Sequence, residues 1–421
     1  MATPICSISL FINVFLLLRS LSEGYAAKEN EATKSYLHIV EVNSLLPPTA
    51  CNHSSKASKS LSLEVVHRHG PCNGILNQEK ATDAPSNIEI LLRDQYRVDS
   101  IHARLPSRGK FPEKQATLPV PSGTSIGAAD YVVTVGIGTP KKDFTLIFDT
   151  GSDITWTQCE PCSKTCYKQK EPSRVRRNKN LFFFGMPLLS AIWRRLLLDR
   201  IDCDRNLDPF INRCVQELLV WVRATKPRPI RRSSRFAGTR SNGYLSFGGK
   251  VSKSVKFTPL SADFDSTPFY GLDITELSVG GRKLSIDASA FSAGTVIDSG
   301  TVISRLPPTA YSELSSEFKK LMTDYPSTSG YSIFDTCYDF SKYETVRIPK
   351  VGVTFKGGVE MDIDVSGILY PVNGSKKFCL AFAGNGDDSD TSIFGNVQQR
   401  TYQVVYDGVK GRVGFAPGGC S

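Results

Sequence analysis

Most of this 421-residue chain lacks an excess of charge of either sign. Residues 171–240 hold 16 Lys and Arg against 6 Asp and Glu, whereas the other 351 residues hold 35 of each. The formal net charge of +10 therefore comes from one segment. A basic chain ordinarily suggests an acidic partner such as nucleic acid. Here most of the chain gives no reason to expect one, and we do not predict nucleic acid as its partner.

The sequence also has no apolar run long enough to cross a bilayer, which takes about 20 residues. The run at residues 11–18 is too short, and no later run reaches that length, so we expect no membrane anchor. A short apolar run followed by small residues such as Gly24 and Ala26 is typical of a secretory signal peptide. We place this signal at residues 1–26, which predicts export through the secretory pathway.

The residues that are abundant favour a mainly β protein with many turns. The chain contains 33 Gly and 24 Pro, and 10% of its residues are aromatic. Its length is sufficient for two domains, each with a core of its own.

Two short apolar runs end in the same way, at an aspartate followed by a hydroxyl residue and a glycine. The first run leads to Asp149 and the second to Asp298. Leu, Ile, Phe and Val before each aspartate indicate a buried strand, and the glycine permits a sharp turn that exposes the carboxylate. The residues of the two turns are Thr150, Gly151 and Ser152 in the first and Ser299, Gly300 and Thr301 in the second.

A pair of aspartates has a chemical use that a single one lacks. Two carboxylates held close together cannot easily both ionise, so they share a proton and titrate as a unit. One can take a proton from water while the other gives a proton to a substrate carbonyl oxygen. The alternative is that both are solvated turn aspartates, which are common. Two such turns, each behind an apolar strand, favour the paired arrangement.

These motifs resemble those of the two-lobed pepsin-like aspartic proteases. The match is to the plant subgroup similar to nepenthesin and to the chloroplast nucleoid DNA-binding protease. Residues 148–153 and 297–301 match the two active-site turns of the family. Residues 393–396 match its apolar-apolar-glycine strand, which threads the loop of the second lobe. The resemblance covers about residues 61–170 and 241–421.

The resemblance implies a bilobal, mainly β fold and an endopeptidase that acts on proteins or peptides. Asp149 and Asp298 would be its catalytic residues, with no metal and no organic cofactor. It further implies a pro-segment over residues 27–116, a first lobe over 117–240 and a second lobe over 241–421. We also expect a monomer, located in the extracellular space (apoplast) or the vacuole.

The expected pro-segment contains a strand-like run at residues 61–72 and then a helix. Ser86 and Glu89 form a possible capping box at the start of this helix. Its apolar face would be formed by Leu91, Leu92, Val98, Ile101 and Leu105. The sequence around His67, His69 and Cys72 lacks a fourth metal ligand, so we do not predict a metal there.

A basic stretch follows this helix and consists of Arg104, Arg108, Lys110 and Lys114. Our hypothesis is that it lies over the acidic cleft and keeps the enzyme inactive until acid protonates the carboxylates. The alternative is a solvated basic linker.

The cysteines admit two interpretations. Cys159, Cys162 and Cys166 have a spacing that could bind zinc, but a signal peptide favours disulfides. By resemblance, Cys337 and Cys379 would form the disulfide of the second lobe. Asn52 and Asn373 lie in glycosylation sequons.

Residues 171–240 do not fit the family. This segment should carry a flap hairpin and the threading strand of the first lobe, but neither motif is recognisable. Tyrosine is absent from residues 168–243, and the segment holds only two glycines. Its periodicity, where present, is helical. We favour a frameshifted, mis-spliced or pseudogene-derived insert. The alternatives are a genuine basic insertion that binds an anionic surface or nucleic acid, and a transposon remnant.

The consequence would be an incomplete first lobe without a flap, and weak or no activity of this chain. A non-catalytic protease-like protein that binds peptides or inhibitors through its second lobe is therefore the alternative function.

The second lobe, in contrast, is complete in sequence. We expect a strand at residues 269–274, a hairpin turn after residues 277–279, and paired strands at 402–406 and 412–415. After Pro307 and Pro308, the spacing predicts a helix. Its apolar face would be formed by Tyr311, Leu314, Phe318, Leu321 and Met322.

Overall fold

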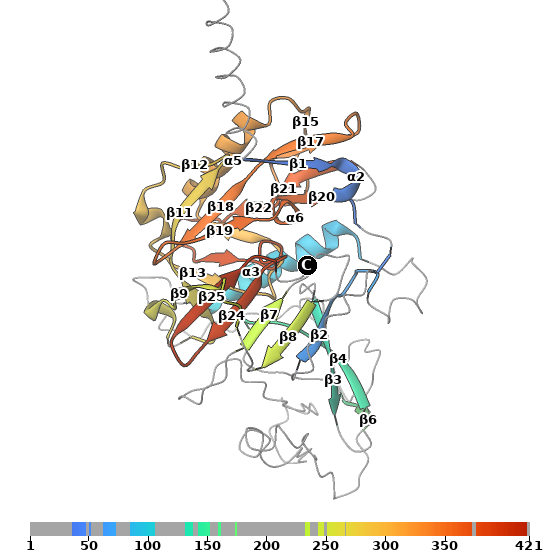
Figure 1. Cartoon of the computed structure of the whole chain (residues 1–421), viewed down its shortest axis with the longest axis vertical. Coiled ribbons are helices and arrows are strands. Elements are labelled where there is room, and N and C mark those ends of the chain that lie inside the picture. Colours follow the sequence, from blue (N-terminus) through green and yellow to red (C-terminus); the bar gives the residue numbers. More distant parts are fainter. Residues whose placement is uncertain are drawn as a thin grey trace, which may run out of the picture.

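Strands dominate the part of the chain that the computed structural model describes (Figure 1). The described residues are 36–47, 50–51, 62–72, 85–105, 131–137, 142–151, 159–160, 173–174, 232–235, 243–247, 251–265, 267–372 and 376–418. The predicted signal peptide, Ser152, and the sequons at Asn52 and Asn373 lie outside them. So do Arg108, Lys110, Lys114, Cys162 and Cys166. The chain is mainly β and has the bilobal pepsin-like architecture that its sequence predicts.

Three of the sheets in the described residues consist of second-lobe strands alone. A five-stranded sheet has the order β10 (Tyr270–Leu272), β13 (Thr295–Ile297), β23 (Ser392–Phe394), β14 (Ser304–Leu306) and β22 (Phe382–Gly384). A four-stranded sheet has the order β12 (Arg282–Lys283), β11 (Ile274–Val279), β18 (Val351–Phe355) and β19 (Val359–Ile363). Another has the order β15 (Ser327–Thr328), β16 (Cys337–Asp339), β21 (Lys377–Leu380) and β20 (Leu369–Pro371).

An eight-stranded sheet joins the two halves of the chain. Its order is β4 (Lys142–Ile147), β3 (Tyr131–Ile137), β2 (Ser62–His67), β8 (Gly243–Phe247), β7 (Arg232–Arg235), β24 (Gln403–Asp407), β25 (Arg412–Ala416) and β9 (Lys256–Pro259). The predicted pairing of the last two strands of the chain, β24 and β25, is confirmed. Strand β2, from the expected pro-segment, pairs with β3 on one side and β8 on the other.

The expected pro-segment also adds strand β1 (Leu37–Glu41) to the second lobe. It pairs with β17 (Thr345–Pro349) in an antiparallel, two-stranded sheet. Figure 1 shows β1 beside β17 at one end of the molecule, far from β2 in the lower part. A short parallel pair, β5 (Cys159–Glu160) with β6 (Ser173–Arg174), completes the strands.

Two long helices carry most of the described helical structure. They are α3 (Asn87–Arg104) and α5 (Pro308–Leu321). The shorter ones are α2 (Val42–Leu45), α6 (Val365–Ile368) and the 3₁₀ turns η3 (Ala262–Phe264) and η4 (Ala288–Phe291).

The apolar faces that the sequence predicted for the two long helices are confirmed except at two residues. In α3 the Ser86–Glu89 capping box is present, and Leu91, Val98 and Ile101 are buried. Leu92, however, is 50% exposed, and in α5 Leu321 is 43% exposed. Leu92 lies one position beyond the buried Leu91, where a period of 3.6 residues turns the side chain away from the stripe. Leu321 lies on the same face as Leu314 but is the last residue of α5.

Three further expectations have different outcomes. Residues 269–274 do not form one strand, because the chain passes from β10 to β11 at Asp273, between two different sheets. The predicted hairpin turn at Gly280 and Gly281 is confirmed, with φ of 57° and 76°. Within residues 171–240 the structure describes only 173–174 and 232–235, which are strands, and the stretches with helical periodicity lie outside the described residues. Strand β7 pairs with both β8 and β24, and such ladders override local preference.

The core of the molecule lies in the second lobe. Aromatic and aliphatic side chains from its sheets and from α5, such as Phe318, Phe340, Phe355 and Phe378, are fully buried. The Cys337–Cys379 disulfide predicted by resemblance is present and joins β16 to β21. A second disulfide, Cys51–Cys72, was not predicted. Cys72 is therefore bonded to another cysteine and is not a free metal ligand.

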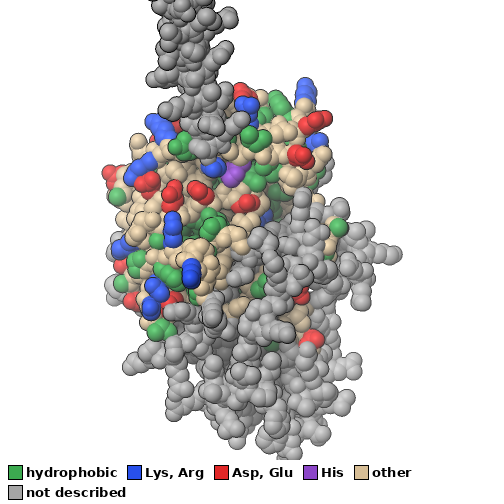
Figure 2. Space-filling view, in the orientation of Figure 1, with side chains coloured by type: hydrophobic (Ala, Val, Ile, Leu, Met, Phe, Trp, Pro, Cys, Tyr) green, Lys and Arg blue, Asp and Glu red, His purple; other side chains and the backbone are tan. Residues whose placement is uncertain are grey.

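Charged side chains of both signs are interspersed over the described part of the face in Figure 2. This arrangement does not form the basic stripe by which nucleic-acid-binding proteins recognise phosphates.

Candidate active site

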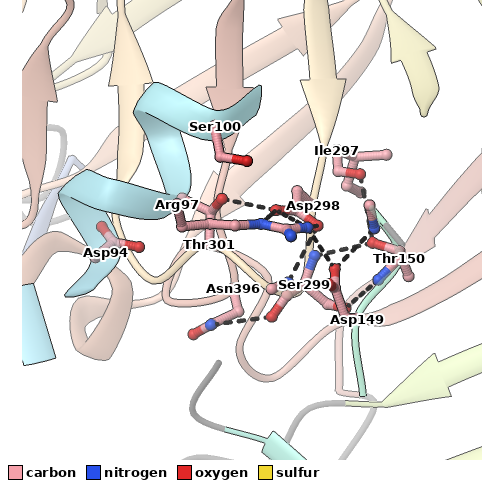
Figure 3. A network of polar contacts seen from close by, with 12 residues as sticks. Asp94, Arg97, Ser100, Asp149, Thr150, Ile297, Asp298, Ser299, Thr301 and Asn396 are labelled. Carbon is pink, nitrogen blue, oxygen red and sulfur yellow. Dashed lines mark hydrogen bonds and ion pairs between the residues drawn. The ribbon is translucent and has the colours of Figure 1, made fainter. Parts of the chain in front are cut away.

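The structure brings the two predicted aspartates to facing turns. Asp149 follows β4 and Asp298 follows β13, and Figure 3 shows both at one centre. A Cβ atom added to Gly151 would collide with the Asp298 carboxylate, and one added to Gly300 would collide with the Asp149 carboxylate. The turns approach so closely that glycine is required at both positions.

Reciprocal hydrogen bonds between the two hydroxyl residues tie the turns together. The Thr150 N–H donates to Ser299 Oγ at 3.0 Å, and the Ser299 N–H donates to Thr150 Oγ1 at 2.9 Å. Each hydroxyl also donates to the opposite strand end: Ser299 Oγ to Phe148 O at 3.2 Å and Thr150 Oγ1 to Ile297 O at 3.4 Å. Thr150 and Ser299 are buried, so this network fixes the relative position of the two carboxylates.

Asp298 is fully buried and receives hydrogen bonds from its own turn. The Gly300 N–H donates to Oδ1 at 3.2 Å and the Thr301 hydroxyl donates to Oδ2 at 2.7 Å. Burial raises the pKa of Asp298, but the charge of Arg97 and hydrogen bonds from Asp149, Thr301 and Gly300 outweigh burial and leave the pKa below its ordinary value. The ionised form of Asp298 is therefore favoured in this structure.

The cation that favours this ionised form comes from helix α3. Arg97 Nη2 lies 2.7 Å from Asp149 Oδ1 and 3.2 Å from Asp298 Oδ2, and Nε lies 3.3 Å from Asp298 Oδ2. Figure 3 shows the guanidinium reaching from the helix to the space between both carboxylates. Its side chain is 16% exposed. Burial lowers the pKa of Arg97, but the charges of Asp298, Asp149 and Asp94 raise it above its ordinary value.

The strand at residues 392–394 supports the second turn, as the sequence predicted. Strand β23 runs parallel to β13 and separates it from β14. Just beyond it, the Asn396 N–H donates to Thr301 O at 2.8 Å, and Asn396 Nδ2 donates to Ser299 O at 3.2 Å. In the part of the chain that the structure describes, β4 pairs with β3 alone, so the Asp149 turn has no equivalent support there.

Comparisons with known proteins agree with this geometry. Two family models match the chain: the N-terminal xylanase inhibitor domain at residues 131–182 and the C-terminal xylanase inhibitor domain at residues 269–417. An aspartyl protease family protein of Arabidopsis thaliana is 41% identical, over 97% of this chain and 98% of its own. The aspartyl protease AED1 of the same plant is 40% identical, over 91% and 92%.

The chain belongs to the plant pepsin-like aspartic protease family. Nepenthesin-2 of Nepenthes gracilis, at 27% identity over 91% of this chain and 97% of its own, is a more distant relative. The alignment with the first Arabidopsis protease extends over 475 positions, at least 54 more than this chain has residues. That relative therefore has residues without a counterpart here. Neither family model matches residues 183–268, which include most of the segment that does not fit the family by sequence.

Sequence analysis did not predict that Arg97 would lie between the two aspartates. We expected Arg104 and the basic residues after it to cover the cleft. Arg104 is instead exposed, donates to Ser100 O and lies over the ring of Phe269. Arg97, two turns earlier, makes the contacts. The signal was present in the sequence: Asp94 and Arg97 interrupt the apolar stripe of α3, where a charged residue needs a partner.

The described residues hold no group of three or more His, Cys, Asp or Glu side chains that could bind a metal ion. Of the helices in the described ranges, none is long and apolar enough to cross a membrane. Cys159 belongs to strand β5. The other two cysteines of the possible zinc motif, Cys162 and Cys166, lie outside the described residues.

Proposed function

We propose that this chain is the inactive precursor of an aspartic-type endopeptidase. Asp149 and Asp298 would share a proton, remove a proton from water and direct that water at a peptide carbonyl. The observation that carries this proposal is the reciprocal bonding of the two turns, which holds both carboxylates within reach of one guanidinium.

In the precursor, Arg97 would prevent this chemistry. The guanidinium lies where the mechanism requires water, and its charge favours the ionised form of Asp298. Acid would weaken the ion pairs by protonating the carboxylates, after which α3 could leave. This mechanism keeps the inhibitory role that we predicted for the pro-segment but assigns it to a different arginine.

The proposed precursor would be exported and act outside the cytosol. The predicted signal peptide and the disulfides Cys337–Cys379 and Cys51–Cys72 support this location, because disulfides persist in oxidising compartments. Asn52 and Asn373 would be its glycosylation sites. The substrates would be proteins or peptides, and the enzyme would be a monomer in the apoplast or vacuole.

We further propose that this chain turns over substrate more slowly than relatives with a complete first lobe. The flap motif that closes the cleft in the family is not recognisable in residues 171–240, and less closure means poorer exclusion of water. The residues of the Arabidopsis relative that have no counterpart here support a loss of residues from this chain. Acid proteolysis as fast as that of the relative would contradict this part of the proposal.

The alternative is a protease-like protein that binds peptides or inhibitors without cutting them. Both matching family models are described as xylanase inhibitor domains, which is the observation that favours this alternative.

The test is pepstatin-sensitive hydrolysis of a denatured protein by the full chain at acid pH. Asp298→Asn and Asp149→Asn should each lower the rate by about 10²–10⁴-fold, because each removes one member of the acid–base pair. Asp287→Asn is the matched control: Asp287 is exposed, its side chain caps η4, and Asn is an equally good cap. Hydrolysis that survives both active-site substitutions would contradict the assignment, and binding without hydrolysis would favour the alternative.

A further inference from the structure

Helix α3 contacts the second lobe through a second charged residue, Asp94, which lies one turn before Arg97. The carboxylate of Asp94 is fully buried. Its Oδ1 accepts the Val302 N–H at 2.6 Å, and its Oδ2 accepts the Ile303 N–H at 3.3 Å. Arg305 Nη2 lies 3.0 Å from the same Oδ2, and its side chain is 2% exposed. Two backbone amides and one guanidinium therefore surround a single carboxylate.

All three of these donors belong to the second lobe, and only the carboxylate belongs to the expected pro-segment. The donors lie in residues 302–305, directly after the Asp298 turn. Ser304 anchors this stretch: both its N–H and its hydroxyl donate to Gln398 Oε1, at 3.1 and 2.6 Å. Gln398 in turn donates to Gly367 O and Ala381 O. The backbone of this stretch is thus held by contacts that do not involve α3, although Arg305 Nη2 also donates to Gln95 Oε1 of α3 at 3.4 Å.

Removal of α3 would leave these donors without the carboxylate they now bind. An arginine stays charged at every physiological pH, and its guanidinium, together with the two neighbouring amides, presents converging donors that suit a carboxylate better than isolated ones. The site would therefore retain an affinity for a carboxylate. Arg305 also donates Nη1 to Ile303 O at 3.0 Å, which keeps its guanidinium oriented toward the place of the Asp94 side chain.

The site lies close to the catalytic pair. Asp94 and Arg97 are three residues apart on one helix face, where side chains are about 5–6 Å from each other. Arg97 contacts both Asp149 and Asp298. Because an extended peptide advances about 3.3 Å per residue, a substrate side chain within about three residues of the cleaved bond would reach the pocket.

We propose that residues 302–305 form a subsite that binds an acidic side chain of the substrate after α3 leaves. Asp94 occupies this subsite in the precursor as a substitute for an Asp or Glu of the substrate. This inference rests on the proposed function, but it concerns which peptides are bound and not whether they are cut.

The test compares two peptides that differ only by Asp or Asn at one position, moved in turn through the three residues on either side of the cleaved bond. With the acid-activated full chain, at one position the Asp peptide should have a kcat/KM about tenfold or more above its Asn twin, mainly through KM. The ratio should rise from pH 3 to pH 5, as the substrate carboxyl ionises around its ordinary pKa of about 3.9. A ratio near one at every position would overturn the subsite and leave Asp94 only a role in holding the pro-segment.

Arg305→Met alone would leave Asp94 buried without its cation and could prevent folding. The double variant Asp94→Asn/Arg305→Met removes both charges and should reduce the Asp-to-Asn ratio to near one. Asp94→Asn alone should keep the ratio of the unmodified chain, because Asp94 leaves with the pro-segment. Arg282→Met is the control, since Arg282 is an exposed arginine on β12. A double variant that keeps its preference for Asp would contradict the proposal.

A second readout separates this inference from the proposed function. The same peptides, with an uncleavable bond and a fluorescent label, are titrated with the acid-treated chain, and binding is followed by anisotropy. Tighter binding of the Asp peptide without hydrolysis would support the subsite and contradict the endopeptidase. Hydrolysis with a ratio of one would do the reverse, and absence of both binding and hydrolysis would overturn both.

Discussion

The two aspartate turns are alike in sequence but are supported differently. The Asp298 turn ends a strand paired on both sides, and Asn396 and Thr301 make further bonds to it. The Asp149 turn ends β4, which in the described part of the chain pairs only with β3. Among the described residues, the first turn has a backbone bond to β3, from the Phe148 N–H to Tyr131 O, and gains further support from bonds that cross to the second lobe and to α3. The second lobe builds its half of the site by itself, whereas the first lobe relies on its partner.

Removal of Arg97 is the strongest way to probe this difference. Arg97→Gln leaves two adjacent carboxylates without their cation, and breaking a buried ion pair in this way costs about 3–5 kcal/mol. We expect amide hydrogen exchange of α3 to accelerate by about a hundredfold or more. Exchange of residues 148–151 should increase more than that of residues 298–301, because the Asp298 turn keeps its other bonds.

The control for this variant is Arg104→Gln, which removes an exposed arginine of the same helix. It should leave the exchange of both turns unchanged. Helix α5 serves as the internal reference, since exchange that accelerates there as well would indicate global unfolding. Equal acceleration of the two turns would contradict the asymmetry argued above.

Acid should release α3. The direction of this pH dependence follows from the lowered pKa of Asp298. Its pKa in the docked state lies below the ordinary value. The ion pair therefore contributes stability above the ordinary aspartate pKa of about 3.9, and that stability is lost as the pH falls through the lowered pKa. Protection of α3, corrected for intrinsic exchange, should decrease between about pH 5 and pH 2 in the unmodified chain. Arg97→Gln should show a much weaker dependence, and an identical dependence in both proteins would contradict this mechanism.

The sequence predicts the features that arise from local patterns. The two turns, the capping box of α3, the hairpin at Gly280 and the paired strands at the end of the chain each carry their own signal over a few residues. The mainly β bilobal fold and the Cys337–Cys379 disulfide follow from the family resemblance. Such features are predictable because their residue types have few other structural uses.

The missed features of the site depend on partners far apart in the sequence. Arg97 and Asp298 are separated by 201 positions, and Asp94 and Arg305 by 211. Strand β7 owes its conformation to β8 and β24, since its own residues have no strong strand pattern. Charged residues on the apolar stripe of α3 could have indicated that partners exist. They could not have identified those partners without the fold.

The cross-turn hydroxyls provide the finest test of the asymmetry, with the smallest expected effect. Ser299→Ala removes the acceptor of the Thr150 N–H, and Thr150→Val removes the acceptor of the Ser299 N–H. Each substitution should cost about 1–3 kcal/mol, because it leaves a buried amide without its bond.

If the second lobe supports its own turn, both substitutions should loosen the same element, residues 148–151, by about tenfold in hydrogen exchange. Residues 298–301 should change little in either variant, because Asn396 still binds the Ser299 and Thr301 carbonyls. A Thr150→Val variant that loosens the Asp298 turn more than the Asp149 turn would show that the Asp298 turn depends on the first lobe, and would contradict the asymmetry.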